Sequence, residues 1–272
     1  MAFHGSRTAV VTVVEDTDGE YLRIDIQEKC LTHGVAYLCF PTLSWRFWET
    51  HPFSVAFQSC SDEDHELGQT FPSGEGAEGA EKSVGGSKIA PVEEPPVNNR
   101  THATTTFFTR CREGLTSKLA GRITAAQTRL RVLIEGPYDH SGRVPSQLAQ
   151  CSGVLCIAGG VGITPCLPYL SRGGTTGAKL FWSVRKQGLA TALAPVLSAL
   201  PSSIRVETVV GQRLDLDSIL RQEMEAKDEG PLAIVVCGPS GMADDVRQKV
   251  VSLARANPLS RPYVLLDEAF SW

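Results

Sequence analysis

The segment from residue 154 to residue 165 limits what this chain can fold into more than any other stretch. An apolar run, Val154 to Ala158, leads directly into a turn that holds Gly159, Gly160 and Gly162. Glycines let the chain turn tightly and let a pyrophosphate approach the backbone. The pattern predicts a strand, a turn and a helix whose first N–H groups face an anion.

Two residues after the glycines support the start of a helix. Thr164 is expected to cap it, and Pro165 suits its first turn because no N–H is needed there. The glycines are spaced G-G-x-G, however, which departs from the G-x-G-x-x-G fingerprint of dinucleotide-binding folds. A phosphate site and a purely structural turn therefore both stay open on this segment alone.

Strands and helices alternate through the C-terminal part of the chain. Further strand-like segments occur at residues 179–184, 204–209, 233–237 and 264–266, and a helix is expected to begin near Gly241. This alternation predicts an α/β domain with a doubly wound parallel sheet, which binds ligands at the carboxyl ends of its strands. We assign residues 149–272 to this domain.

The N-terminal part has short strands separated by turns. They are expected at residues 8–15, 21–26, 35–40, 104–109 and 130–135. Their spacing predicts a small antiparallel β-barrel, which we assign to residues 1–148. Gly, Glu, Ser and Pro dominate residues 58–103, and such a composition buries too little apolar surface to fold. We expect a disordered insertion there, between two barrel strands.

The composition is that of an ordinary globular protein. The chain has 272 residues, of which 42% are hydrophobic and 21% charged, and this length suits about two domains. The net charge of −4, without a basic run interleaved with aromatic residues, argues against a nucleic-acid partner. No apolar leader follows the N-terminus. Prolines and glycines interrupt the uncharged residues 144–171, so we expect a buried strand and helix there, not a membrane span.

The eight cysteines form no C-x-x-C pair. Cys151 and Cys156 have the first spacing of a plant-type iron–sulfur motif, but the rest of that motif is missing. Several others lie in apolar surroundings, where a free thiol packs as a small hydrophobic residue. We therefore expect reduced core thiols in a cytosol-facing protein, and no metal site.

Six short motifs, taken in order, resemble the ferric reductase and NADPH oxidase family of the ferredoxin–NADP reductase superfamily. They are His51-Pro52-Phe53-Ser54, Gly114-Leu115-Thr116, Gly136-Pro137-Tyr138, Gly159 to Pro165, Cys237-Gly238-Pro239 and the tail Asp267 to Trp272. Residues 45–56 and the aromatic-ended tail look closest to fungal ferric reductases. The resemblance runs from about residue 8 to the C-terminus, apart from the insertion. It implies a FAD-binding barrel followed by an NADPH-binding domain.

The resemblance implies that the barrel binds FAD and that His51 and Pro52 take part in this binding. Phe53 would lie against the isoalloxazine ring, and Ser54 would place its hydroxyl near the flavin nitrogen that receives hydride. The turn Gly136-Pro137-Tyr138 would lie under the flavin. For His51-Pro52-Phe53-Ser54 the alternative is structural, with Phe53 as a core residue of a strand.

Gly114, Leu115 and Thr116 would meet the FAD diphosphate, with Arg110 as a charge partner. The alternative is a turn in which Thr116 is the N-cap of a helix that begins at Ser117. Both interpretations can hold together.

In the second domain, the resemblance implies that the glycine turn, Thr164 and Pro165 hold the NADPH pyrophosphate. Arg185 follows the second strand, where an arginine can fork onto the 2′-phosphate and select NADPH over NADH. Its alternative is a solvated cation.

Cys237, with Gly238 and Pro239, would border the nicotinamide and help position it for hydride transfer, and Trp272 would cover the flavin until nicotinamide displaces it. The structural alternatives are a buried thiol for Cys237 and a frayed terminal residue for Trp272.

Two positions depart from the family pattern. His51 stands where the wider superfamily usually has arginine, and Asp139 stands where the family usually has another glycine. Both changes are expected to weaken FAD binding, because they make the surroundings of an anionic cofactor less positive. The haem-binding transmembrane helices that precede this module in the family have no counterpart in the sequence. We expect a soluble module, a truncated product or a fragment, whose family works at the cytosolic face of a membrane.

The sequence thus predicts an FAD-dependent oxidoreductase that moves electrons from NADPH to a one-electron acceptor, haem or ferric iron. A haem-binding transmembrane domain outside this chain is a candidate partner. Two alternatives stay open: an NADPH oxidase module that reduces oxygen, and an inactive cofactor-binding or interaction module. The acceptor, the role of the insertion and the oligomeric state do not follow from the sequence.

Overall fold

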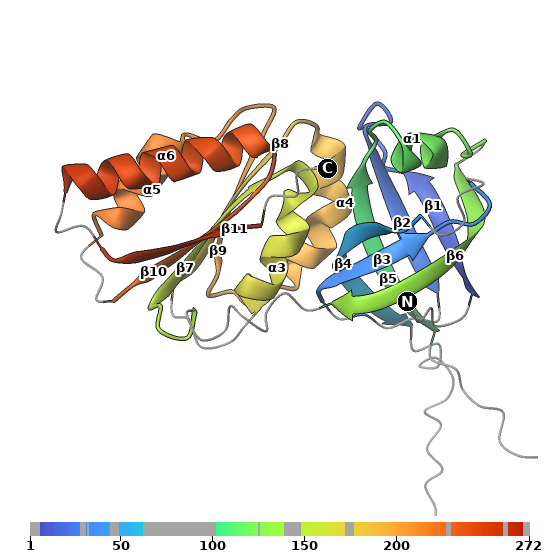
Figure 1. The fold of residues 1–272 in the computed structure, drawn as a ribbon, viewed down its shortest axis with the longest axis horizontal. Coiled ribbons are helices and arrows are strands. Elements are labelled where there is room, and N and C mark those ends of the chain that lie inside the picture. Colours follow the sequence, from blue (N-terminus) through green and yellow to red (C-terminus); the bar gives the residue numbers. More distant parts are fainter. Residues whose placement is uncertain are drawn as a thin grey trace, which may run out of the picture. The chain divides into compact units, whose positions relative to one another are not determined.

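The computed structural model describes residues 6–27, 31, 33–43, 49–61, 102–124, 126–138, 148–171, 177–226, 230–257 and 261–268. The described residues up to Ser59 and from Ala103 onward belong to one compact unit, and Cys60–His102 form another. The first unit contains an antiparallel barrel and a parallel sheet flanked by helices (Figure 1). The second unit lies almost entirely outside the described residues.

The barrel closes in the strand order β1-β2-β5-β4-β3-β6. Its strands are β1 (Ser6–Val13), β2 (Tyr21–Gln27), β3 (Val35–Cys39), β4 (His51–Ser61), β5 (His102–Arg110) and β6 (Gln127–Tyr138). Alternate side chains, among them Val11, Ile24 and Phe107, fill the interior, as a strand's period of two requires. The short helix α1 (Leu115–Ala120) adds Leu119 to this core. The predicted antiparallel barrel is confirmed.

The second sheet is parallel and has the order β11-β10-β7-β8-β9. Its strands are β7 (Gly153–Gly159), β8 (Ala178–Val184), β9 (Arg205–Val210), β10 (Leu232–Cys237) and β11 (Tyr263–Asp267). The chain moves outward from β7 to β9 and then crosses back to β10. Strand order therefore reverses beside β7, which is where open α/β sheets form a ligand crevice. The predicted doubly wound sheet is confirmed.

Helices cover both faces of this sheet (Figure 1). The short 3₁₀ helix η2 (Gly160–Gly162) leads into α3 (Ile163–Ser171), and α4 (Gln187–Ser198), α5 (Leu216–Met224) and α6 (Ser240–Ala256) follow. In β7, Cys156 packs in one core with residues of α3 and α4, whereas its neighbour Ile157 packs in another with residues of α5 and α6. Because both faces are covered, β7 is buried and its sequence is apolar throughout.

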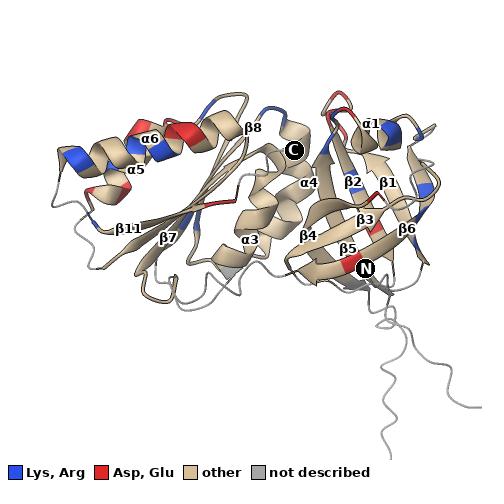
Figure 2. Cartoon of the chain, in the orientation of Figure 1, with Lys and Arg blue, Asp and Glu red and all other residues tan. Residues whose placement is uncertain are grey.

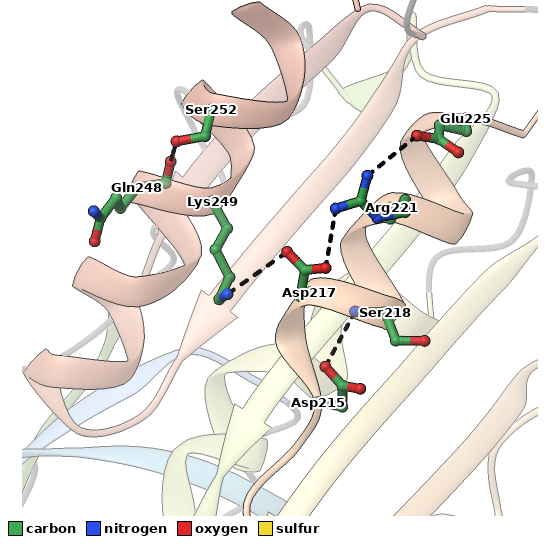
Figure 3. Close-up of polar contacts among 8 residues, drawn as sticks. All are labelled: Asp215, Asp217, Ser218, Arg221, Glu225, Gln248, Lys249 and Ser252. Atoms are coloured by element: carbon green, nitrogen blue, oxygen red, sulfur yellow. Dashed lines mark hydrogen bonds and ion pairs between the residues drawn. The ribbon is translucent and has the colours of Figure 1, made fainter. Parts of the chain in front are cut away.

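Polar contacts join α5 to α6 at the surface (Figure 3). The Asp215 carboxylate caps α5 by accepting a hydrogen bond from the Ser218 N–H at 3.2 Å. Asp217 pairs with Arg221 at 3.1 Å and with Lys249 of α6 at 3.7 Å. The hydrogen bond from Arg221 lowers the pKa of Asp217. These charges belong to an exposed surface of mixed sign (Figure 2) and stabilise the fold only slightly.

The predicted elements lie close to their predicted positions, whereas β4 and α5 are not among the predicted strands and helices. β4 runs through Ser61 and β5 begins at His102, so strands reach into both ends of the predicted insertion. Residues 62–101 lie outside the described residues. The sequence around α5 carries a usable pattern, because Leu216, Leu220 and Met224 have helical spacing after the Asp215 cap.

Three further findings concern the described part of the chain. It contains no helix that is long and apolar enough to cross a bilayer. Its free cysteines are Cys39, Cys111, Cys151, Cys156, Cys166 and Cys237. It contains no group of His, Cys, Asp and Glu side chains arranged to hold a metal ion.

Candidate functional site

The turn after β7 is built from glycines that leave no room for side chains. A Cβ on Gly162 would lie 2.4 Å from the carbonyl oxygen of Cys237, and one on Gly159 would lie 3.0 Å from the ring of Pro239. Gly160 has a φ of 58°, which glycine adopts without strain. The backbone of the turn therefore lies directly against the end of β10.

Trp182 of β8 holds this turn from the neighbouring strand. Its side chain is fully buried, and its indole N–H donates a hydrogen bond to the carbonyl oxygen of Gly160 at 2.8 Å. From the barrel, the hydroxyl of Tyr21 approaches the same glycine, since a Cβ on Gly160 would lie 3.2 Å from it. The turn is thus fixed by protein contacts alone.

The two residues predicted to start the helix have different outcomes. Thr164 does not cap α3, because the helical turn already begins at Gly160 and Thr164 is the second residue of α3. Its side chain is buried, and its hydroxyl donates to the carbonyl oxygen of Val161 at 3.0 Å. Pro165 lies in the first turn of α3, as predicted.

Cys237 ends β10 beside the glycine turn. It is buried, and its Sγ donates a hydrogen bond to the carbonyl oxygen of Glu268 at 2.9 Å. Burial raises the pKa of the Cys237 thiol far above its usual range, and the nearby Cys166 and Glu268 add to the effect. A thiol that keeps its proton acts here through shape and hydrogen bonding, since only the thiolate is a nucleophile.

Glu268 ties the segment after β11 to two other elements. Its N–H donates to the carbonyl oxygen of Val236 at 2.9 Å, and its carboxylate accepts a short hydrogen bond from the hydroxyl of Tyr169 in α3. Burial and this carboxylate raise the pKa of Tyr169 far above its usual range. The predicted Trp272 lies outside the described residues.

On the barrel side, β4 presents the predicted flavin motif with alternating faces. Phe53 is 8% exposed and belongs to the barrel core, where it meets Phe107 edge to face at 6.4 Å between ring centroids. The period of two puts Pro52 and Ser54 on the opposite face of the strand. This arrangement favours the core interpretation of Phe53 over stacking on a flavin. His51 is half-buried, with its Nε2 3.6 Å from the Glu49 carboxylate.

The predicted diphosphate motif forms the start of α1. Gly114, with a φ of 90°, is the N-cap, and Leu115 and Thr116 are the first two helical residues. Thr116 is therefore not the N-cap of a helix that begins at Ser117, because the glycine conformation starts the helix earlier. The Thr116 hydroxyl accepts from the N–H of Arg112 at 2.8 Å and donates to its carbonyl oxygen at 3.0 Å.

The two predicted phosphate-binding arginines share one carboxylate. Arg110 ends β5, and its Nη2 lies 2.7 Å from Oε1 of Glu20. Arg185 follows β8, and its Nη1 lies 3.4 Å from the same oxygen. The neighbouring Lys186 pairs with Asp18 at 2.6 Å. Arg185 is thus a partnered cation, although 65% of its side chain is exposed.

The third barrel motif lies across β3 from the flavin motif, since Val35 pairs with both Ser54 and Tyr138. Gly136-Pro137-Tyr138 ends β6 and contains a cis peptide bond before the proline. Tyr138 packs edge to face on Tyr37 and donates to the Glu135 carboxylate, which raises the pKa of Tyr138. None of the three motif residues lines the cavity that the other motifs share. Asp139 lies outside the described residues.

A cavity of about 1170 Å³ brings most of the predicted site residues together. The barrel contributes His51, Pro52, Phe53, Ser54, Arg110, Gly114, Leu115 and Thr116 to its walls. The α/β part contributes Gly159, Gly160, Gly162, Thr164, Pro165, Arg185, Cys237, Gly238 and Pro239. The volume exceeds the roughly 300–1,000 Å³ of ordinary small-molecule pockets, so the cavity suits a large or extended ligand.

The cavity also has lining residues that the sequence analysis missed. Arg213 lies just after β9, as Arg185 lies just after β8, and Gly211 N–H donates to the Val184 carbonyl oxygen at 2.8 Å, which joins the two strand ends. A cation shortly after a predicted strand is a usable indication of this residue, because Arg213 follows the predicted strand at residues 204–209 by four positions. Glu20 gave no such indication, because only the folded chain brings it beside both arginines.

Comparisons with known proteins identify the fold. No protein-family model matches this sequence, and no curated protein matches it. The ferredoxin NADP+ reductase of Neisseria gonorrhoeae, solved with bound FAD and NADP, has a TM-score of 0.58 at 12% identity, over 97% of this chain and 98% of that one. Full-length CYP116B46 of Tepidiphilus thermophilus has a TM-score of 0.57 at 19% identity, and the match covers 98% of this chain but 29% of that chain. The CS-b5R domains of human Ncb5or have a TM-score of 0.53 at 13% identity, over 100% of this chain and 70% of that chain.

At these identities the likeness establishes a shared fold. The chain has the two-domain architecture of the ferredoxin NADP+ reductase, a closed antiparallel barrel followed by a parallel sheet with helices on both faces. The fold class predicted from the sequence is therefore confirmed.

Proposed function

We propose that this chain is an FAD-dependent NADPH oxidoreductase that delivers electrons to a one-electron acceptor. The observation that carries the proposal is one large cavity, whose walls combine the barrel residues expected to hold FAD with the turn expected to hold NADPH. A ferredoxin NADP+ reductase with this fold is solved with both FAD and NADP, which supports the same pair of cofactors here.

The glycine turn fits a dinucleotide pyrophosphate. Its backbone is bare, because a Cβ on Gly162 would collide with the end of β10. The first N–H groups of a helical segment lack partners within it, and the three residues of η2, Gly160, Val161 and Gly162, line the cavity. Arg185 and Arg213 add positive charge at the ends of two neighbouring strands, where a 2′-phosphate would be recognised.

The barrel wall fits FAD with one change from the sequence-based expectation. Ser54 and Pro52 border the cavity from the outer face of β4, so they would meet the flavin ring, while Phe53 supports them from the core. Arg110 would partner the diphosphate near Gly114 and Thr116. His51 faces Glu49, so this position adds little net positive charge for the cofactor.

When bound, FAD converts the two-electron donation of NADPH into single-electron release. The chain's own residues would bind and orient. Cys237 would border the nicotinamide as a protonated thiol, fixed by its hydrogen bond to Glu268. Ser54 would offer its hydroxyl to the flavin edge. The buried walls formed by β7 and β10 would keep water from the back of the site.

We further propose ferric iron or haem as the acceptor. The support is the resemblance of residues 45–56 and of the C-terminal tail to fungal ferric reductases. A haem-binding transmembrane domain on another polypeptide, or outside the given sequence, would be the partner in that case, and the chain would then work at a membrane surface. Reduction of a ferric chelate, compared with superoxide yield under air, distinguishes this acceptor from oxygen.

Anaerobic mixing of the FAD-reconstituted chain with NADPH tests the proposed function. Loss of the oxidised flavin absorbance is the expected result. Gly162→Ala should retain FAD but lose this bleaching, because the new Cβ forces the pyrophosphate turn away from β10. Gly121→Ala is the matched control, since Gly121 does not line the cavity and a Cβ there would make only an ordinary contact, 3.5 Å from the carbonyl oxygen of Ser117. Bound flavin that NADPH fails to bleach in the unmodified chain would instead indicate an inactive module.

A further inference from the structure

Glu20 is an unexpected residue in a cavity proposed for two anionic cofactors. It lies directly before β2, with 16% of its side chain exposed, and its Oε1 faces arginines from two different parts of the fold. That oxygen is shielded from solvent and accepts no well-aligned hydrogen bond from the described residues. Charge attraction to the two guanidinium groups, and not hydrogen bonding, holds it.

The two arginines are held unequally. Arg110 is the closer partner at 2.7 Å, and 34% of its side chain is exposed. Arg185 lies at 3.4 Å and is 65% exposed, so it can turn away from Glu20 into the cavity. If it does so, Arg110 still neutralises the buried carboxylate. The arrangement therefore lets Arg185 change partners without leaving Glu20 as an unpaired buried charge.

We propose that Glu20 sets the preference between NADPH and NADH by competing with the 2′-phosphate for Arg185. The inference rests on the proposed function. A phosphate that takes both prongs of the Arg185 guanidinium must draw it away from the Glu20 carboxylate. The same carboxylate repels a phosphate dianion, whereas it does not repel the uncharged 2′-hydroxyl of NADH. Glu20 thus lowers the selectivity that Arg185 alone would give.

A double-mutant cycle on the full chain tests this role by binding and needs no turnover. Calorimetry would measure the dissociation constants of NADP+ and NAD+ for the unmodified chain, Glu20→Gln, Arg185→Ala and the double variant. Glu20→Gln should raise the affinity ratio of NADP+ to NAD+ by about three- to fivefold, the range of a partly exposed charge pair. In the Arg185→Ala background the same change should move the ratio little.

Two further variants make the test specific. Glu20→Asp keeps the charge but withdraws the carboxylate from Arg185. It should therefore raise the affinity ratio of NADP+ to NAD+ less than Glu20→Gln does. If the glutamine variant does not fold, the aspartate variant tests the role of Glu20 in its place. Glu207→Gln is the matched control. Glu207 is exposed and pairs with Arg205 at the start of β9, whereas the cavity lies at the end of this strand. It should leave both dissociation constants unchanged.

The outcomes separate this inference from the proposed function. If neither dinucleotide binds the unmodified chain, the proposed function itself fails. If both bind and Glu20→Gln leaves the ratio unchanged or lowers it, the role of Glu20 is overturned while the function stands. An equal rise in the presence and absence of Arg185 would also overturn it, because Glu20 would then act without that arginine.

Discussion

Gly188, in the first turn of α4, lies directly against the backbone carbonyl of Glu15 in the turn between β1 and β2. A Cβ at position 188 would lie 1.8 Å from that oxygen, a distance that no rearrangement of a flexible side chain could relieve. The barrel turn and the start of α4 therefore depend on the absence of a single methyl group.

Replacing Gly188 by alanine should destabilise the chain. The backbone must shift to admit the methyl group, and over-packing of this kind lowers the free energy of unfolding by about 1–3 kcal/mol. Urea unfolding followed by circular dichroism would measure the loss. Gly241→Ala serves as the control and should change stability by no more than about 1 kcal/mol. Equal unfolding midpoints for the two variants would show that the contact is not tight.

Trp182→Phe should weaken dinucleotide binding without emptying the core. The phenyl ring keeps most of the apolar packing but loses the N–H that donates to the Gly160 carbonyl oxygen. Loss of one buried hydrogen bond destabilises by about 1–3 kcal/mol, and the freed turn should bind NADP+ several-fold more weakly. Calorimetric titration with NADP+ measures this effect. Unaltered affinity would mean that the turn keeps its shape without Trp182.

Removing one partner of the Lys179–Glu223 ion pair should destabilise the chain more than replacing both partners by apolar residues. Glu223 is 3% exposed, and both of its carboxylate oxygens accept from the Lys179 ammonium, at 2.7 and 2.9 Å. Lys179→Met leaves a buried carboxylate unpaired and should lower the free energy of unfolding by about 3 kcal/mol. Lys179→Met combined with Glu223→Leu should recover most of this loss in urea unfolding. If the double variant were no more stable than the single one, packing and not charge would explain the effect.

The buried thiols should make the fold less stable in alkali. The hydrogen bond with Cys156, together with burial, raises the pKa of Cys166, and burial raises that of Cys237, both from an ordinary 9.0. Above that pH the unfolded chain releases these protons while the folded chain keeps them. The contribution of these thiols to the free energy of unfolding is thus fully present below pH 9.0. As pH rises beyond this value, it falls by about 1.4 kcal/mol per pH unit for each thiol.

Urea unfolding at a series of pH values from neutral to alkaline checks this slope. Cys166→Ala should have a shallower dependence than the unmodified chain, because one of the protons retained on folding is gone. A free energy of unfolding that stays level above the ordinary thiol pKa would contradict the prediction.

Local sequence was sufficient to predict both domains. The apolar run at residues 154–158 has the composition of a strand buried on both faces, and β7 is such a strand. The alternation at residues 21–26 likewise marks a strand with one face in the barrel core, as β2 has. Patterns of this kind depend on periodicity, and periodicity survives errors of a residue or two in the boundaries.

The remaining features depend on contacts between distant residues. The sequence does not indicate that Phe53 meets Phe107, which lies far along the chain, while it also lines the cavity; its contact with a flavin stays a prediction. Thr116 and Thr164 were assigned as caps, yet preceding glycines start both helices earlier. Nothing near Glu20 in the sequence indicates that two arginines will meet its carboxylate.

The hydrogen bond between Trp182 and Gly160 gives the chain an optical property. The chain has four tryptophans, Trp45, Trp48, Trp182 and Trp272. Indole fluorescence responds to the electric field and the hydrogen bonding around the ring. The group that Trp182 bonds to belongs to the turn at which a charged ligand would arrive. In a chain whose other three tryptophans are replaced by phenylalanine, the emission of Trp182 would therefore report occupancy of that turn, with no dye attached.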